Sequence, residues 1–311
     1  MIKEYAVEPA VFSDTEYSVY MYKSFGLNNG RLMADLPSTW DETAGKLIDI
    51  TCHGKQRKRM KARVISLKRK CSSKRRKMVW DSNKNWLENV LIEHGRIPLS
   101  AIITKKSAGS ANENVVSLKD LEKDECPQWD VLDTVSVERT ANKMAKCAEF
   151  FLQRAEKKIV FVDPHFDPSK RRFLRPLRKF LQTISNRPGE YSMPRLEIHL
   201  NDDLGLDFFK LNCTTKVREI LRDELPEGCE LGFVRWERKY LHDRFILTEF
   251  GGLSYSVGLD DHDYKSVERT KVSLLKNTFK EEWDNHQLET TSFERADAEG
   301  EDVYKVDFSI S

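Results

Sequence analysis

The sequence predicts an α/β protein, because residues 136–290 alternate between helical and strand patterns after a mixed α+β region of unassigned fold over 1–135. Two observations carry this prediction. Short apolar runs such as KKIVF and RLEIHL are separated by longer segments whose apolar residues recur at helical spacing. Repeated units of this kind build a mostly parallel or mixed sheet flanked by helices. The length of 311 residues is enough for two ordinary domains.

The first region offers few regular patterns. A strand is expected over 46–52, and Trp86, Val90 and Leu91 predict a helix over 83–94. Polar and acidic residues then dominate from about 105 to 135, which is typical of a linker or loop-rich boundary. The sequence therefore predicts a first region with a linker over 1–135, and the basic run described below makes it a candidate nucleic-acid-binding region.

The second region has regular elements in close succession. The patterns predict helices over 137–157, 169–185, 206–224 and 277–287, and strands over 157–164, 195–200, 229–236, 240–249, 252–259 and 271–275. A separate acidic tail over 291–311 is expected to stay disordered or to fold back on the basic run described next.

A basic run over 54–77 holds 13 Lys and Arg residues and no acidic residue, although the whole chain has a net charge of only +2. Such a run is the expected footprint of a protein that binds phosphate polymers, since neutralised phosphates release counterions. A solvated arm and an anionic membrane surface are the alternatives. The candidate phosphate-binding residues are Lys55, Arg57, Lys58, Arg59, Lys61, Arg63, Lys68, Arg69, Lys70, Lys74, Arg75, Arg76 and Lys77.

The segment 239–260 contains the strongest chemical pattern. A strand here would place His242 and Arg244 on the same face, because side chains alternate along a strand. An imidazole can attack phosphorus or protonate a leaving oxygen, and a guanidinium can hold two phosphate oxygens. The pattern therefore indicates a phosphodiester site, and the alternative is a histidine at a strand end beside a solvated arginine.

A second polar segment, VDPHFDP, follows the strand predicted over 157–164. Asp163 and His165 could bind or orient a substrate there, because ligands collect at the carboxyl ends of strands in open sheets. Its two prolines equally favour a simple turn. A metal site is not expected at this segment, at the polar cluster 260–263 or at Cys52, His53 and Cys71, because none has a recognised ligand spacing.

These motifs resemble those of the phospholipase D superfamily, in which a histidine, a lysine two residues later and an aspartate precede glycine and serine residues. The matching positions here are His242, Arg244, Glu249, Gly251, Gly252, Ser254, Ser256 and Gly258, with arginine in place of lysine and glutamate in place of aspartate. The chain is more similar still to the phospholipase D-like C-terminal domain of microtubule-interacting-and-transport proteins and its bacterial relatives. That pattern matches Asp163-Pro164-His165, His242-Asp243-Arg244, Gly251-Gly252 and Gly258-Leu259-Asp260.

The resemblance implies a phospholipase D-like mixed sheet flanked by helices over 136–290. The superfamily enzymes use two motif copies and no metal, so one copy per chain implies a homodimer. His242 would then be nucleophile or general acid, Arg244 the phosphate clamp and Glu249 the carboxylate that orients His242. Phosphate contacts would come from Asp163, His165, Ser254 and Ser256.

Three functions follow as hypotheses. The first is a dimeric, metal-independent nuclease, with a role in prokaryotic defence against phage or plasmid by analogy of fold. The second is a module that binds phosphate or nucleic acid without cleavage and recruits partner proteins, as the microtubule-interacting-and-transport relatives bind phosphate headgroups. The third is an adaptor on anionic lipid.

The remaining expectations concern the setting of the protein. No apolar run approaches the length of a membrane span and the first residues lack a signal-peptide pattern, so we expect a cytoplasmic protein without integral membrane contact. Its six cysteines are scattered and are expected to be reduced. No cofactor is expected.

Overall fold

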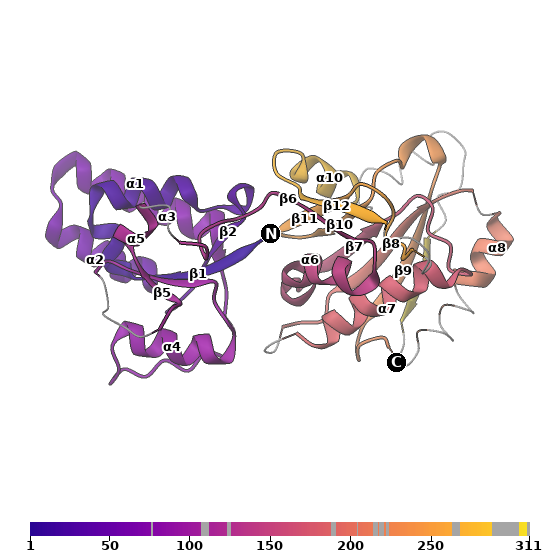
Figure 1. Cartoon of the computed structure of the whole chain (residues 1–311). Helices are drawn as coiled ribbons and strands as arrows, with labels where there is room; N and C mark the ends of the chain where they lie inside the picture. The colour runs from indigo at the N-terminus through magenta and orange to yellow at the C-terminus, as the bar shows by residue number, and fades with distance from the viewer. Residues whose placement is uncertain are drawn as a thin grey trace. The chain divides into compact units, whose positions relative to one another are not determined.

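The computed structural model divides the chain into two compact units, Met1–Asp133 and Thr134–Ser311 (Figure 1). Each unit has a sheet of its own and is described by itself. The structure describes residues 1–75, 77–106, 112–122, 126–187, 191–203, 205–213, 217, 221, 224–262, 268–287 and 305–309.

The first unit is built on a five-stranded sheet in which every described pair of strands is parallel. The strand order is β3-β2-β1-β4-β5. The chain thus runs outward from β1 to β3 and then crosses to β4 on the other side of β1, as in doubly wound α/β folds. The strands are β1 (Lys3–Val7), β2 (Arg31–Ala34), β3 (Ser72–Ser73), β4 (Ala101–Thr104) and β5 (Val115–Ser117).

Helices cover both faces of this sheet (Figure 1). They are η1 (Pro9–Ser13), α1 (Thr15–Ser24), η2 (Leu27–Asn29), α2 (Trp40–Thr51), α3 (Gly54–Cys71), α4 (Trp86–Arg96) and α5 (Leu118–Glu122). The strand expected over 46–52 was wrong, because this stretch is the end of α2. Its buried residues Trp40, Ala44 and Ile48 are spaced by four and form the apolar stripe of a helix.

The second unit contains an eight-stranded mixed sheet in the order β13-β9-β8-β7-β10-β11-β12-β6. The strands β7, β8 and β9 are parallel, and β10, β11, β12 and β6 continue as an antiparallel series. Their bounds are β6 (Thr134–Glu138), β7 (Lys158–Val162), β8 (Arg195–Asn201), β9 (Glu230–Trp236), β10 (Phe245–Thr248), β11 (Gly251–Tyr255), β12 (Arg269–Leu274) and β13 (Lys305–Ser309).

Helices flank this sheet too, as expected for an α/β fold (Figure 1). They are α6 (Ala141–Arg154), α7 (Arg171–Ser185), α8 (Leu206–Leu211), η4 (Arg238–Tyr240) and α10 (Phe279–Asn285). Alternate residues of β7 point to opposite faces of the sheet. Phe161 stacks on Phe180 of α7. Val160 and Val162 belong to the cluster against which Trp283 of α10 packs.

Several predicted boundaries in the second unit differ from the structure. The helix expected over 137–157 is preceded by strand β6, and the helix expected over 206–224 is described as α8 only to Leu211. Within the expected acidic tail, residues 305–309 form β13, which pairs antiparallel with β9. The other residues of 291–311 lie outside the described residues.

Candidate functional site

One edge of the second sheet gathers a polar pocket with a volume of about 270 Å³. The register pairs Val162 with Phe245, Phe245 with Ser254 and Arg269 with Glu138, so the ends of β7, β11 and β6 meet the starts of β10 and β12 at this edge. The lining residues are Arg139, Asp163, His165, Arg172, Phe173, Arg244, Ser256, Val257, Gly258 and Asp260. Three arginines and two carboxylates thus share a small space that is open to a ligand.

Arg244 is the least satisfied of the three arginines. It is half-buried, and its Nη1 donates to the His242 carbonyl at 2.9 Å. Its buried Nε has no hydrogen-bond partner within the described part of the chain. Buried donors are nearly always paired, so an unpaired guanidinium N–H in the wall of a pocket marks a place for a ligand acceptor.

Asp260 holds the other two arginines in place. It is 3% exposed and forms ion pairs with Arg139 and, at 3.4 Å, with Nε of Arg172. Arg139 also pairs with Glu268 at 2.9 Å and donates to the Asp260 carbonyl at 3.2 Å. These two guanidinium groups are therefore oriented by fixed partners and offer their remaining donors to the pocket.

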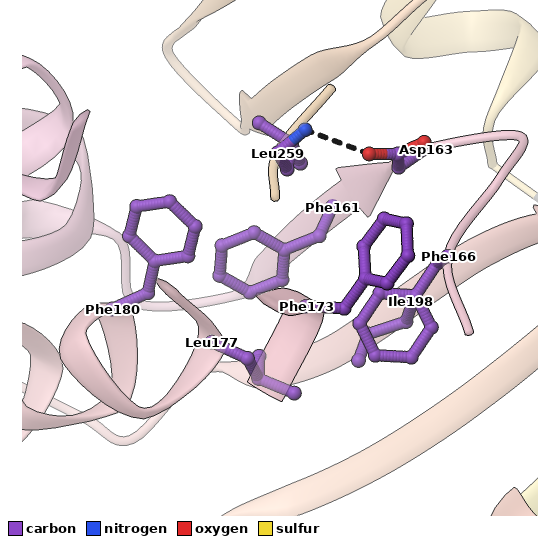
Figure 2. Close-up of a pocket in the computed structure, with 8 residues that line it drawn as sticks. All are labelled: Phe161, Asp163, Phe166, Phe173, Leu177, Phe180, Ile198 and Leu259. Atoms are coloured by element: carbon purple, nitrogen blue, oxygen red, sulfur yellow. Dashed lines mark hydrogen bonds between the residues drawn. The ribbon is translucent and has the colours of Figure 1, made fainter. Parts of the chain in front are cut away.

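Asp163 organises the floor of the pocket. One carboxylate oxygen accepts from the amide of Leu259 at 2.7 Å, the contact drawn in Figure 2, and the other accepts from the amide of His165 at 3.0 Å. Figure 2 shows this carboxylate at the edge of an aromatic cluster that includes Phe161 and Phe173. Burial there, opposed by the two amide hydrogen bonds, raises the pKa of Asp163. Asp163 thus ties the loop after β11 to the loop after β7.

Gly258 lies between the two carboxylates. A Cβ on this residue would meet Oδ1 of Asp260 and come within 3.1 Å of Oδ2 of Asp163. The close approach of the loop to both acids therefore requires glycine at this position.

The structure does not bring the expected triad of His242, Arg244 and Glu249 together. His242 and Arg244 precede β10 and are not part of a strand. Among the contacts described, Nε2 of exposed His242 lies 3.0 Å from the Lys239 carbonyl. Because a carbonyl only accepts, Nε2 is the donor. Glu249 follows β10 at the opposite end of the strand. The rise of four strand residues places it roughly 13 Å from the start of β10 at Phe245. Its Oε1 accepts from the amides of Glu156 and Lys157, so Glu249 fixes a turn and cannot orient His242.

The other residues predicted to contact phosphate divide between pocket and scaffold. His165 is exposed and lines the pocket, with its Nδ1 3.9 Å from Asp203. Ser256 also lines the pocket, where its hydroxyl accepts from the amide of Lys271 at 3.0 Å. Ser254 lies within β11 and is not a lining residue.

The basic run of the first unit is mostly helix α3. Met60, Val64, Leu67 and Cys71 form its buried stripe, so the charged residues occupy the outer surface. We call Lys55, Lys58, Arg59, Arg63 and Arg69 the α3 basic face; the first three and Arg69 are exposed, and Arg63 is half-buried. Other members are engaged with the unit: Arg57 and Lys61 lie near Asp49, Lys68 pairs with Asp41, and Lys70 donates to the Tyr22 carbonyl.

The end of the run differs from the prediction. Lys74 and Lys77 are exposed, and Arg76 lies outside the described residues. Arg75 is buried, and its guanidinium bonds Glu4 at 2.5 Å, Glu93 at 3.2 Å and the Ile97 carbonyl at 2.6 Å. Its expected role in phosphate binding was therefore wrong, because every partner of this side chain belongs to the core of the first unit.

Several residues of interest were missed in the sequence. Arg139 is remote from the other pocket residues along the chain and reaches them only through the pairing of β6 with β12. A buried group around His199 was also missed: Trp236 donates to its Nδ1 at 3.1 Å, and Glu197 lies 3.3 Å from its Nε2. The i, i+2 spacing of Glu197 and His199 on one strand was the available signal.

Neither a metal-binding cluster nor a membrane-spanning helix occurs among the described residues. The described parts of the chain contain no group of three or more His, Cys, Asp or Glu residues that could hold a metal ion. Asp260 and Asp261 instead pair with arginines, the latter with Arg175 at 3.3 Å. All six cysteines are free thiols. None of the described helices has the length and apolar character needed to cross a bilayer.

Comparison with known proteins gives little further information. No protein-family model matches the chain, and no curated protein matches it. Among solved structures, it is similar to TrmBL2, described as an archaeal chromatin protein with a novel mode of DNA binding. The likeness has 13% identity and a TM-score of 0.29 and covers 55% of this chain and 56% of that one, so it is too weak to carry an argument.

Proposed function

We propose that this protein binds nucleic acid through its phosphates and that the pocket around Arg244 takes one phosphate group. The observation that carries the proposal is that Arg244, whose buried Nε has no partner among the described residues, lines a pocket that also presents Arg139 and Arg172. A phosphate oxygen is an acceptor that fits this donor, and guanidinium groups hold phosphates through charge-assisted hydrogen bonds.

The carboxylates of the pocket do not prevent this binding. Asp260 is paired with Arg139 and Arg172, and burial raises the pKa of Asp163. Asp163 also lies near Arg244, and both of its carboxylate oxygens accept hydrogen bonds from backbone amides. Arg244 differs from the other two arginines, because it forms no ion pair with a carboxylate among the contacts described.

The α3 basic face supplies a second, independent anionic-ligand surface in the first unit. Its exposed side chains project from a helix that is anchored by a buried apolar stripe, which makes it a structured surface and not a loose arm. Clustered Lys and Arg residues bind polymer phosphates with a strong salt dependence, because each contact releases counterions. This surface accounts for affinity toward a polymer, whereas the pocket accounts for the position of one phosphate.

Fluorescence anisotropy with labelled single- and double-stranded DNA and RNA tests the proposal. Replacing Lys55, Lys58 and Arg59 by Glu should weaken binding by more than tenfold and flatten the dependence of affinity on salt. The matched control places Glu at Lys143, Lys146 and Lys280, which are exposed in the second unit. Equal loss in both triple variants would mean that net charge alone controls binding and would contradict a specific surface.

A dimeric, metal-independent phosphodiesterase of the phospholipase D type is the second candidate. It is favoured by His242, whose imidazole is exposed and whose backbone carbonyl accepts from Nη1 of Arg244, the proposed phosphate clamp. In this candidate a second copy of the chain supplies the second histidine, and cleavage of foreign nucleic acid would give the protein a role in defence.

Incubation of the same nucleic acids with the full chain in excess EDTA separates the two candidates. Binding without cleavage supports the binding module, which would then act by recruiting partner proteins. Cleavage that His242→Ala abolishes and His53→Ala retains would establish the phosphodiesterase. The His53 variant is the control because this exposed histidine belongs to the first unit and its side chain does not cap α3.

A further inference from the structure

The first unit has a pocket of its own at the point where its strand order reverses. Strands β2 and β3 extend the sheet on one side of β1, and β4 and β5 extend it on the other. In open parallel sheets, ligands bind outside the carboxyl ends of the strands at this switch point, because the two crossovers leave a crevice there. A pocket with a volume of about 440 Å³ lies at this location.

Three segments meet in this pocket. Glu8 directly follows β1. Thr104 is the last residue of β4 and is followed by Lys105 and Lys106. Trp86 and Leu87 are the first two residues of α4. The volume is within the range of pockets that hold a small organic ligand and is large enough for a mononucleotide. The position and the size therefore both point to a small-molecule site.

The polar groups of the pocket suit an anion at one end. Lys106 is exposed, and the ammonium group of half-buried Lys105 donates to Ser13 at 3.0 Å. The N-terminus of α4 adds partial positive charge. Its capping box occupies the amides of Asn85 and Glu88, which leaves the first-turn amides of Trp86 and Leu87 without intrahelical partners.

The other residues that line the pocket suit a ligand that carries hydroxyl groups and a planar ring. Glu8 is held by the amide of Lys105 at 2.8 Å, and a carboxylate in this position accepts from hydroxyl groups. The indole of Trp86 is anchored through its Nε1, which donates to the Leu36 carbonyl at 3.0 Å. Its remaining exposed surface offers a face or edge to an aromatic ring.

We infer that this switch-point pocket binds a mononucleotide, with its phosphates toward Lys106 and the start of α4. The connection after β1 is Glu8 followed by η1, which begins at Pro9, and contains no glycine-rich loop. Dinucleotide-binding folds hold pyrophosphate on such a loop. Here the anion contacts come from the residues after β4 and from α4, which favours a mononucleotide over a dinucleotide.

Isothermal titration of the full chain with ADP tests this inference. We expect saturable binding with one ADP per chain in the wild type and in Lys119→Glu, a control with the same charge change on exposed α5. Lys106→Glu should weaken ADP binding by about tenfold or more, because it replaces a charge-assisted contact by repulsion. Lys106 is exposed, so this variant is expected to fold normally.

Arg244→Gln separates this inference from the proposed phosphate site of the second unit. ADP binding that persists in Arg244→Gln and falls in Lys106→Glu supports the switch-point pocket. No ADP binding at millimolar concentration, or equal affinity in wild type and Lys106→Glu, would overturn it. Loss of ADP binding in Arg244→Gln would place the nucleotide in the second unit and would also overturn it.

Discussion

The buried histidine at the end of α10 makes the stability of the second unit depend on pH. His286 is 6% exposed, its Nδ1 lies 2.7 Å from the Glu282 carbonyl, and its ring centroid is 5.3 Å from that of His199. Burial, reinforced by His199, lowers the pKa of His286 from 6.5 to about 3. The folded protein therefore keeps this ring neutral where the unfolded chain would protonate it.

The sign and size of the effect follow from this difference. The unfolded state binds more protons than the folded state between pH 6.5 and about pH 3, so stability falls as the pH falls through this window. Between pH 7 and pH 5, His286 should cost about 2 kcal/mol of unfolding free energy. The buried carboxyl of Glu197 does not interfere: His199, Lys158 and Arg195 outweigh its burial and lower its pKa to about 2, so its contribution changes only below pH 4.5.

Urea unfolding at pH 7, 6 and 5, followed by tryptophan fluorescence, measures this effect. Trp236 reports locally, because its ring centroid is 5.6 Å from that of His286. The variant His286→Asn keeps a donor for the Glu282 carbonyl but cannot titrate, so its stability should fall by about 2 kcal/mol less over this range than that of the wild type. Parallel pH profiles of stability for the two proteins would show that His286 is not the source of the pH dependence.

Two further variants test the scaffold of each unit. Arg75→Met should destabilise the first unit by about 3–5 kcal/mol, because it removes the shared partner of buried Glu4 and Glu93 and leaves Glu93 with Arg96. Exposed Arg69→Met should change little, and equal thermal shifts would contradict this. Gly258→Ala should cost about 1–3 kcal/mol and weaken oligonucleotide binding, because its Cβ meets two carboxylates. Gly205→Ala, with open space around it, is the control, and unchanged binding by Gly258→Ala would exclude a tight loop at the pocket.

The regular elements of the second unit were largely predictable from the sequence. Helix α7 and strand β8 agree with the expected ranges 169–185 and 195–200 to within two residues, because each has a strong apolar period and clear polar boundaries. The strand expected over 240–249 is shorter because Leu241 to Arg244 form a loop after η4. Leu241 and the apolar run that starts at Phe245 thus suggested a longer strand than the backbone forms.

The site was predictable only in part. Asp163, His165, Arg244 and Ser256 were expected and line one pocket, because they flank strands whose ends share an edge of the sheet. Arg139 could not be expected from local pattern, since its place depends on the pairing of β6 with β12. Glu249 was expected beside His242 from motif spacing alone, but a β-strand carries it to the opposite edge.

Binding of a single phosphodiester is the most direct test of the account. We would titrate the dinucleoside monophosphate thymidylyl-thymidine into the wild type, Arg244→Gln and Arg238→Gln, an exposed arginine outside the pocket, by isothermal calorimetry. The account predicts saturable binding that weakens by about tenfold in Arg244→Gln and stays unchanged in Arg238→Gln. Equal affinity in all three proteins, or no binding by the wild type, would contradict it.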